Sequence, residues 1–136
     1  MKYLALLAML TASPALADNG WSSGFERGVP YHVLTLDSLR LTVICDKEQS
    51  RGRADPGMIL VQIGGSGHET SGPVQITSGA QTARLNLSYG TILERETAPA
   101  DWARAVALLS SDQAVTITIG HQAWAFRNPA PRDIGC

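Results

Sequence analysis

Short runs in which hydrophobic and polar residues alternate make up much of the chain beyond its first 17 residues. The strictest alternation is found in residues 39–45, 82–89 and 115–119. In the first of these runs every second residue is apolar, from Leu39 to Cys45. Because successive side chains of a strand point to opposite faces of a sheet, each run predicts a strand with one buried face.

Four weaker runs complete the expected set of strands, and they are residues 31–36, 58–63, 74–77 and 122–127. Residues 58–63 are almost continuously apolar, which favours a central strand with both faces covered. Gly120 and His121 are expected to form a tight turn between the last two strands. About seven strands, separated by glycine, proline and polar clusters, predict an all-β fold consisting of a single antiparallel β-sandwich.

One segment has helical instead of strand periodicity. Trp102, Val106 and Leu109 recur at helical spacing, and this predicts one short helix near residues 98–110. Thr97 is the expected N-cap, because a threonine hydroxyl can accept a hydrogen bond from the first backbone N–H groups of a helix. We expect this helix to cover one end of the sandwich.

Residues 1–17 have the pattern of a cleavable export signal. Lys2 supplies a positive charge, an apolar stretch follows, and Ala15-Leu16-Ala17 gives the small-x-small pattern at which such signals are cut. The apolar stretch is shorter than the roughly 20 residues that a membrane-spanning helix needs. The remaining residues 18–136 are expected to form one soluble β-sandwich domain that is periplasmic or secreted.

The charge balance narrows the class of partner. The whole chain carries a formal net charge of −1, and removal of Lys2 with the signal lowers it to −2. A weakly acidic surface does not favour nucleic acid or an anionic membrane surface as the partner. We therefore expect the partner to be an envelope or extracellular protein.

Cys45 and Cys136 are the two cysteines of the chain. Outside the cytoplasm the environment is oxidising, and a cysteine pair there is more often bonded than free. A redox-active role is not favoured, because the sequence contains no Cys-x-x-Cys motif. The sequence thus predicts a structural disulfide between Cys45 and Cys136.

No motif predicts catalysis. Residues 64–68 are similar to a nucleophile elbow, but His68 stands where the second glycine is required and no helix is expected to follow. His32, His68 and His121 are the histidines of the chain, and none has a second ligand at the spacing of a metal site. His32 is expected on the solvent face of its strand. We expect no catalytic residue, no metal and no cofactor.

Candidate partner-binding residues come from an early tryptophan and a glycine-rich loop. Trp21 precedes the first expected strand, and tryptophan is a frequent anchor at protein interfaces when it is exposed. The loop at residues 64–73 carries Ser66, His68 and Glu69. Loops on a rigid scaffold often carry recognition. These four residues are the sequence-based candidates for contact with a partner.

The order of these features is similar to that of small exported proteobacterial proteins. A tryptophan near the start of the mature chain is followed by a strand ending in cysteine at residues 41–46, a second strand at residues 59–63, and a late helix with a hairpin ending in Phe126. This arrangement resembles the invasion-associated locus B-like proteins and the type VI secretion-associated periplasmic accessory proteins. The resemblance implies a β-sandwich accessory protein without an established active site, although the cysteine count differs from that of the first group.

Three functions remain open at this stage. The favoured one is a non-enzymatic binding or accessory protein of the cell envelope, because recognisable catalytic motifs are missing. The alternative is a proteinaceous inhibitor of a lytic enzyme such as lysozyme, in which residues 66–69 would enter the catalytic cleft. The third is a hydrolase whose site is assembled from residues far apart in the sequence.

Overall fold

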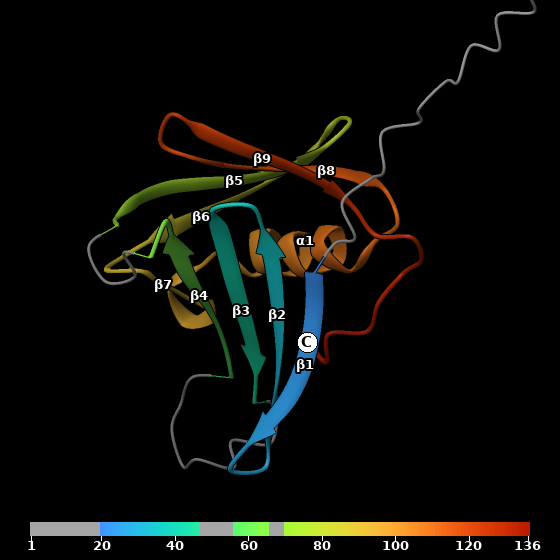
Figure 1. The fold of residues 1–136 in the computed structure, drawn as a ribbon. Coiled ribbons are helices and arrows are strands. Elements are labelled where there is room, and N and C mark those ends of the chain that lie inside the picture. The colour runs from blue at the N-terminus through green and yellow to red at the C-terminus, as the bar shows by residue number, and fades with distance from the viewer. Residues whose placement is uncertain (1–19, 47–55, 66–69) are drawn as a thin grey trace, which may run out of the picture.

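The computed structural model describes residues 20–46, 56–65 and 70–136 and shows two antiparallel sheets and one α-helix (Figure 1). The five-stranded sheet has the strand order β1-β2-β3-β4-β7. Its strands are β1 (Gly20–Glu26), β2 (Val29–Leu36), β3 (Leu39–Cys45), β4 (Gly57–Ile63) and β7 (Thr91–Leu93). The four-stranded sheet has the order β6-β5-β8-β9. Its strands are β5 (Gly72–Ser78), β6 (Gln81–Leu87), β8 (Ala114–Ile119) and β9 (Gln122–Arg127).

The two sheets pack face to face, which confirms the predicted all-β sandwich. Their strands cross steeply, because β1 to β4 run along the height of the view in Figure 1 while β5, β8 and β9 run across it. Such crossing belongs to the orthogonal class of sheet packing. All the strands expected from the sequence are present, as β2 to β6, β8 and β9, and the described residues add β1 and β7.

Strand β1 has no apolar alternation, and its sequence is rich in glycine and serine. It forms because Arg27 and Gly28 make a tight turn, with φ values of 52° and 80°. Positive φ at both central residues matches the turn that best suits the twist of a two-residue hairpin. The turn places β1 in register with β2 from Gly20 to Glu26, so the local turn and the ladder determine this strand.

The core lies between the sheets and follows the alternation of the sequence. In β3, Leu39, Leu41 and Val43 are buried as predicted. Buried side chains of the opposite sheet face them, and these are Val74, Ile76, Ala83, Leu85, Leu87, Val115, Ile117, Ile119, Trp124 and Phe126. The predicted core role of the two aromatic residues of β9 is thereby confirmed.

The alternation of residues 82–89 ends earlier than expected. Strand β6 stops at Leu87, and Tyr89 has a φ of 48° and is 75% exposed. The backbone turns here, because Ser88 and Thr91 pair with each other across Tyr89 and Gly90. The inward position expected for Tyr89 is therefore wrong, since a turn interrupts the strand before that residue.

Helix α1 (Pro99–Ser110) packs against β6 and β5, and it buries Trp102, Ala105, Leu108 and Leu109. It also covers the free edge of β6. The Arg84 N–H donates to Asp101 Oδ1 at 3.1 Å, and Arg104 Nη1 donates to the Thr82 carbonyl oxygen at 3.1 Å. An edge strand left open can pair with another chain, so the helix protects this edge while completing the core.

The predicted N-cap at Thr97 is wrong. The helix begins at Pro99 after Ala98, and the cap makes no side-chain hydrogen bond. Thr97 Oγ1 instead donates to the Leu93 carbonyl oxygen at 2.8 Å, across the short 3₁₀ helix η1 (Glu94–Glu96). The threonine hydroxyl is thus used by the preceding turn, and proline in the first helical position needs no N–H partner.

The C-terminal tail, residues 128–136, leaves the four-stranded sheet and crosses to the five-stranded one. Asn128 is 1% exposed, and its side chain makes three hydrogen bonds. Asn128 Nδ2 donates to the carbonyl oxygens of Leu109 at 2.9 Å and Ser111 at 2.8 Å, and Asn128 Oδ1 accepts from Trp21 Nε1 at 2.8 Å. The amide therefore links β1 to the end of the helix.

The tail ends at a disulfide bond between Cys136 and Cys45, which confirms the predicted pair. The bond joins the last residue of the chain to the end of β3 over a sequence separation of 91 residues. Ile134, two residues earlier, is buried in the core. The tail is thus held at its start by Asn128 and at its end by the disulfide.

Removal of the disulfide is expected to destabilise the domain without changing its fold. Cys136→Ser releases a long closed loop, and such losses cost about 2–5 kcal/mol in small exported domains. Chemical denaturation of the variant and of the wild type under non-reducing conditions measures the difference. Two alkylated thiols per native wild-type chain, found by mass spectrometry, would show that the bond does not form in solution.

Core and surface positions of the four-stranded sheet are expected to differ sharply in their tolerance of alanine. Leu85→Ala and Ile117→Ala remove buried side chains and should each lower the free energy of unfolding by about 2–4 kcal/mol. The control substitution Arg84→Ala, at an exposed position beside Leu85, should change it by less than about 1 kcal/mol. Equal effects at Leu85 and Arg84 would contradict the observed register.

Candidate binding groove

The outer face of the five-stranded sheet, which points away from the core, carries the candidate site. Antiparallel pairing places Val33 of β2 opposite Thr42 of β3, and Thr42 opposite Leu60 of β4. The next pair of β2 and β3 on the same face is Tyr31 with Ile44. Side chains at paired positions lie on the same face, so these residues form a surface that extends over three strands.

Two valines of this outer face are buried although they do not belong to the core. Val29 is 2% exposed and Val33 is 4% exposed, yet neither belongs to the cluster between the sheets. Val33 is followed by Leu34, which is fully buried in that cluster. Strand β2 therefore buries apolar side chains on both of its faces, which an ordinary solvated outer face does not do.

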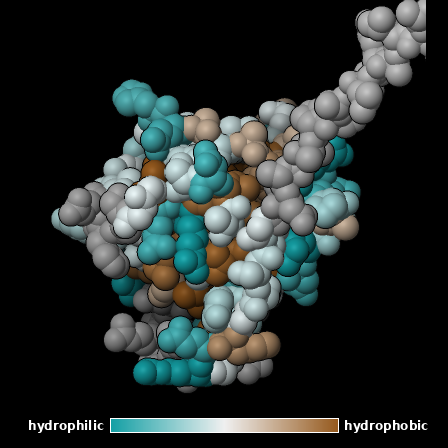
Figure 2. Space-filling model, in the orientation of Figure 1, coloured by the Kyte–Doolittle hydropathy of each residue, from teal (hydrophilic) through white to brown (hydrophobic). Residues whose placement is uncertain are grey.

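Two adjoining hollows, which together we call the outer groove, run over this face. One has a volume of about 210 Å³ and lies over β2 and β3, and the other, of about 270 Å³, reaches across β4 to Gly90 and Thr91. Arg40, Thr42 and Leu60 line both hollows. Figure 2 looks onto this face and shows hydrophobic surface in a depression with hydrophilic side chains beside it.

Both hollows mix apolar and polar groups. The first is lined by Val29, Tyr31, Val33 and Ile44, with Glu26, Arg40 and Thr42 beside them. The second adds Val61 together with Gln62 and Thr91, whose amide and hydroxyl groups can donate and accept hydrogen bonds.

Glycine in β1 shapes one wall of the outer groove. Gly24 pairs with Tyr31, and a Cβ atom added at Gly24 would lie 2.5 Å from Tyr31 Oη and 2.6 Å from Tyr31 Cζ. Real Cβ atoms do not approach other atoms so closely, so the tyrosine ring can lie across β1 only because position 24 has no side chain.

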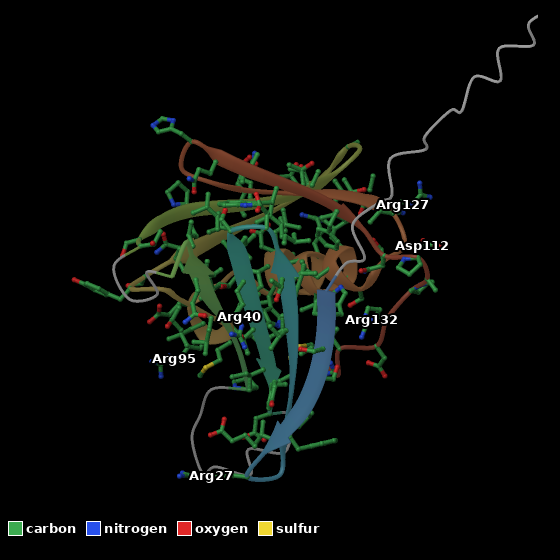
Figure 3. The ribbon with its side chains drawn as sticks, in the orientation of Figure 1. Arg27, Arg40, Arg95, Asp112, Arg127 and Arg132 are labelled. Carbon is green, nitrogen blue, oxygen red and sulfur yellow. A yellow bond between two sulfur atoms is a disulfide. The ribbon has the colours of Figure 1, made fainter. Side chains whose placement is uncertain are left out.

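Arg40 is the charged group at the junction of the two hollows. Figure 3 shows it in the middle of the outer face, apart from the other labelled charged side chains. Within residues 20–46, 56–65 and 70–136, no hydrogen bond or ion pair engages its guanidinium group. A guanidinium group offers five N–H donors in a planar fork that suits a carboxylate. The outer groove can thus bury apolar groups and bind an anion beside them.

The sequence-based candidates lie elsewhere. Trp21 is half-buried on the opposite face of β1, bonded to Asn128, and the Arg132 guanidinium lies 5.3 Å from the centre of its ring. Ser66, His68 and Glu69 lie outside the described residues, as do residues 1–17. The structure therefore gives Trp21 a role in holding the tail, and its contact with a partner stays a prediction.

His32 is not on the solvent face that was expected for it. It lies on the inward side of β2, half-buried, with its Nδ1 atom 2.7 Å from Ser23 Oγ. Burial lowers the pKa of His32 from its ordinary value of 6.5, the positive charge of Arg132 lowers the pKa further, and Asp133 opposes both. The tail places Arg132 and Asp133 near this histidine, which no local pattern in residues 31–36 could indicate.

One signal in the sequence points to the outer groove. Neighbouring apolar residues interrupt the alternation at Val33-Leu34, at Val43-Ile44 and along residues 58–61. In each case one residue faces the core and its neighbour faces the outer groove. The continuous apolarity of residues 58–63 agrees with the central position of β4 between β3 and β7, and it also marks an outer face with apolar side chains, such as Leu60 at 37% exposure.

The chain matches no protein-family model, no curated protein and no solved structure. Among the described residues, no group of three or more His, Cys, Asp or Glu side chains is placed to hold a metal ion. No helix in the described parts of the chain is long and apolar enough to cross a membrane. The geometry of the outer groove is therefore the basis on which function is inferred.

The lowered pKa of His32 predicts a loss of stability in mild acid. Because the folded chain binds the proton of His32 less readily than the unfolded chain, stability is retained above the ordinary pKa of 6.5 and is lost as the pH falls through the lower folded value. Thermal unfolding between about pH 7.5 and pH 5 measures the effect. His32→Gln should reduce the fall, whereas His121→Gln, in the exposed turn between β8 and β9, should leave it unchanged. A fall of the same size in all three proteins would exclude His32 as its source.

Proposed function

We propose that this protein is a non-enzymatic, exported binding or accessory protein of the cell envelope, and that the outer groove is the surface that contacts its partner. The observation that carries the proposal is a groove on the outer face in which Tyr31, Ile44 and Leu60 keep part of their apolar surface accessible. Concave surfaces with apolar side chains and a few polar groups are the usual form of binding sites. Such a face stabilises a complex when a partner removes the remaining apolar surface from water.

Export is supported by the signal pattern and by the disulfide. Residues 1–17 have the pattern of a cleavable signal. The Cys45–Cys136 disulfide is of the kind that persists in oxidising compartments. The resemblance to exported proteobacterial accessory proteins agrees with both, so we place the protein in the periplasm or outside the cell.

Binding is favoured over catalysis by the groups that line the outer groove. Its described lining contains three hydroxyl side chains, Tyr31, Thr42 and Thr91, together with Arg40, Glu26, Gln62 and apolar residues. A hydroxyl nucleophile needs an adjacent general base, and none of these three hydroxyl groups makes a described hydrogen bond to a histidine or carboxylate. The arrangement is suited to holding a surface of another protein.

Capture of partners from an envelope extract tests the proposal. Leu60→Asp places a charge in the middle of the outer groove and should remove the captured protein. The matched control Ala125→Asp introduces the same charge at an exposed position of β9, on the other sheet, and should leave capture intact. Melting temperatures of both variants establish that they are folded.

Two observations decide the outcome. They are which protein is captured, and whether its capture changes in the variants. Equal capture by the wild type and by folded Leu60→Asp would show that the outer groove is not the contact surface. Capture of a lysozyme that depends on residues 66–69 would favour the inhibitor. Turnover of peptidoglycan, ester or peptide substrates that disappears in Ser66→Ala or His68→Ala would overturn the non-enzymatic assignment.

A further inference from the structure

Strand β1 is an edge of the five-stranded sheet, and none of the other described strands lies beyond it (Figure 1). An edge presents N–H and C=O groups that can pair with another chain, so proteins usually protect it. Helix α1 covers the edge of β6, and β7, at the other edge of the five-stranded sheet, is three residues long. Strand β1 has seven residues and contains neither lysine nor proline. Its edge is thus suited to pairing.

The register of β1 and β2 determines which backbone groups this edge offers. Antiparallel ladders alternate between pairs that exchange hydrogen bonds and pairs that do not. The two-residue turn after Glu26 makes Glu26 and Val29 a bonded pair. The N–H and C=O groups of Trp21, Ser23 and Phe25 therefore point away from β2. Within the described parts of the chain, these three residues make no backbone hydrogen bond elsewhere.

The side chains of the same three residues share one face of β1, because they are two positions apart. On this inward face Trp21 bonds to Asn128, and Ser23 bonds to His32. Phe25 is 79% exposed, which is the largest exposure among the large apolar side chains of the described residues. The edge therefore has an aromatic residue on either side of Ser23, and one of the two has most of its surface in water.

We infer that β1 pairs with β1 of a second copy of this chain, antiparallel and centred on Ser23. In this register the Ser23 residues of the two copies stand opposite each other, and Trp21 of each copy stands opposite Phe25 of the other. All three outward-pointing residues then exchange hydrogen bonds across the new ladder. A shift of the centre to Ser22 or Gly24 leaves one aromatic residue without a partner in β1. The pairing is self-complementary, as a two-fold dimer requires.

Both faces of the new strand pair favour a second copy as the occupant. On the inward face, Trp21 of one copy covers the exposed ring of Phe25 of the other, and aromatic pairs across strands stabilise a sheet. On the outward face, Glu26 stands opposite Gly20, so no like charges meet at paired positions. The edge thus matches itself in backbone groups, in apolar surface and in charge.

The edge of β9 is a poorer match for a second copy. The two-residue turn between β8 and β9 makes Ala123, Ala125 and Arg127 its outward-pointing residues. The rings of Trp124 and Phe126 are already buried in the core. Pairing of β9 with itself would therefore cover little apolar surface, whereas pairing of β1 covers an exposed ring.

The dimer joins the two sheets into one continuous sheet with five strands from each copy. Paired side chains lie on the same face, so the two-fold axis is perpendicular to the sheet and both outer grooves open on one side. A partner that carries two matching surfaces would bind both copies at once, which strengthens binding without any new contact. The inference itself is independent of the proposed function.

Sedimentation equilibrium of residues 18–136 over about 1 µM to 1 mM tests the inference, because an edge-strand interface is small and such complexes are weak. The mass should rise to twice that of the monomer. Phe25→Lys removes the aromatic pair and adds a charge at the edge, so it should raise the dissociation constant about tenfold or more. The matched control Tyr89→Lys changes another exposed aromatic residue, outside β1, and should leave the constant unchanged. Melting temperatures establish that both variants are folded.

Cross-linking tests the register. Ser23→Cys places two cysteines opposite each other at the ~5.5 Å Cα separation of a bonded pair, which a disulfide can bridge. Mild oxidation should therefore give a covalent dimer. In the matched control Ser22→Cys, the two cysteines lie diagonally, beyond the ~7 Å limit for a disulfide, and the chain should remain without a cross-link. Mass spectrometry under non-reducing conditions identifies the linked residues.

Several results would overturn the inference. These are a monomer mass over the whole concentration range, equal dissociation constants for the wild type and folded Phe25→Lys, and cross-linking of Ser22→Cys as readily as of Ser23→Cys. Capture of an envelope protein that is lost in Phe25→Lys while the wild type stays monomeric would assign the edge to a different chain. Leu60→Asp lies outside β1 and should dimerise as the wild type does, so failure of the dimer and failure of the proposed function are distinguishable.

Discussion

The structure depends on the way in which the C-terminal tail fastens the two sheets to each other. Asn128 makes this connection in the core, where its amide bonds to the end of helix α1 and to Trp21 of β1. The Cys45–Cys136 disulfide then fixes the end of the tail to β3. A buried polar group that lacks a partner is costly. Movement of Trp21, Leu109 or Ser111 away from Asn128 would therefore leave part of its buried amide unpaired. The inward face of β1 is therefore anchored, and its outward face can serve as a fixed wall.

Strand β1, held in place by the tail, forms one side of the candidate site. Gly24 lies on β1 beneath Tyr31, and Tyr31 borders the apolar hollow that also contains Val29 and Val33. Strands β2, β3 and β4 bury one set of side chains in the core and present a second apolar set to the outer groove. Tyr31, Ile44 and Leu60 keep part of their surface accessible on this face, and exposed apolar surface that forms a patch is typical of sites that contact other molecules.

Arg40 adds a positive charge to this apolar surface. A purely hydrophobic face would attract many partners, whereas a guanidinium group that lines both hollows favours an occupant with a negative charge beside it. Electrostatic complementarity of this kind contributes to specificity and to register more than to affinity. In the proposed function, apolar burial in the outer groove would stabilise the complex and the charge of Arg40 would contribute to specificity.

The sequence by itself determined the strands, the short helix, the core faces and the cysteine pair, because alternation, helical spacing and redox context are local or compositional signals. It did not determine β1, whose glycine and serine residues carry no alternation and which forms through pairing with β2. It also placed His32 on the wrong face, because residues 31–36 have apolar side chains at both odd and even positions, and only pairing with the core residue Val43 of β3 assigns His32 to the inner face. For the outer groove, the sequence carries only the signal of a second apolar face on these strands, and tertiary structure decided the rest. Neighbouring apolar residues such as Val33 and Leu34 are consistent with a strand covered on both faces, and only the packing of the sheets shows which face the core covers and which face remains open to a partner.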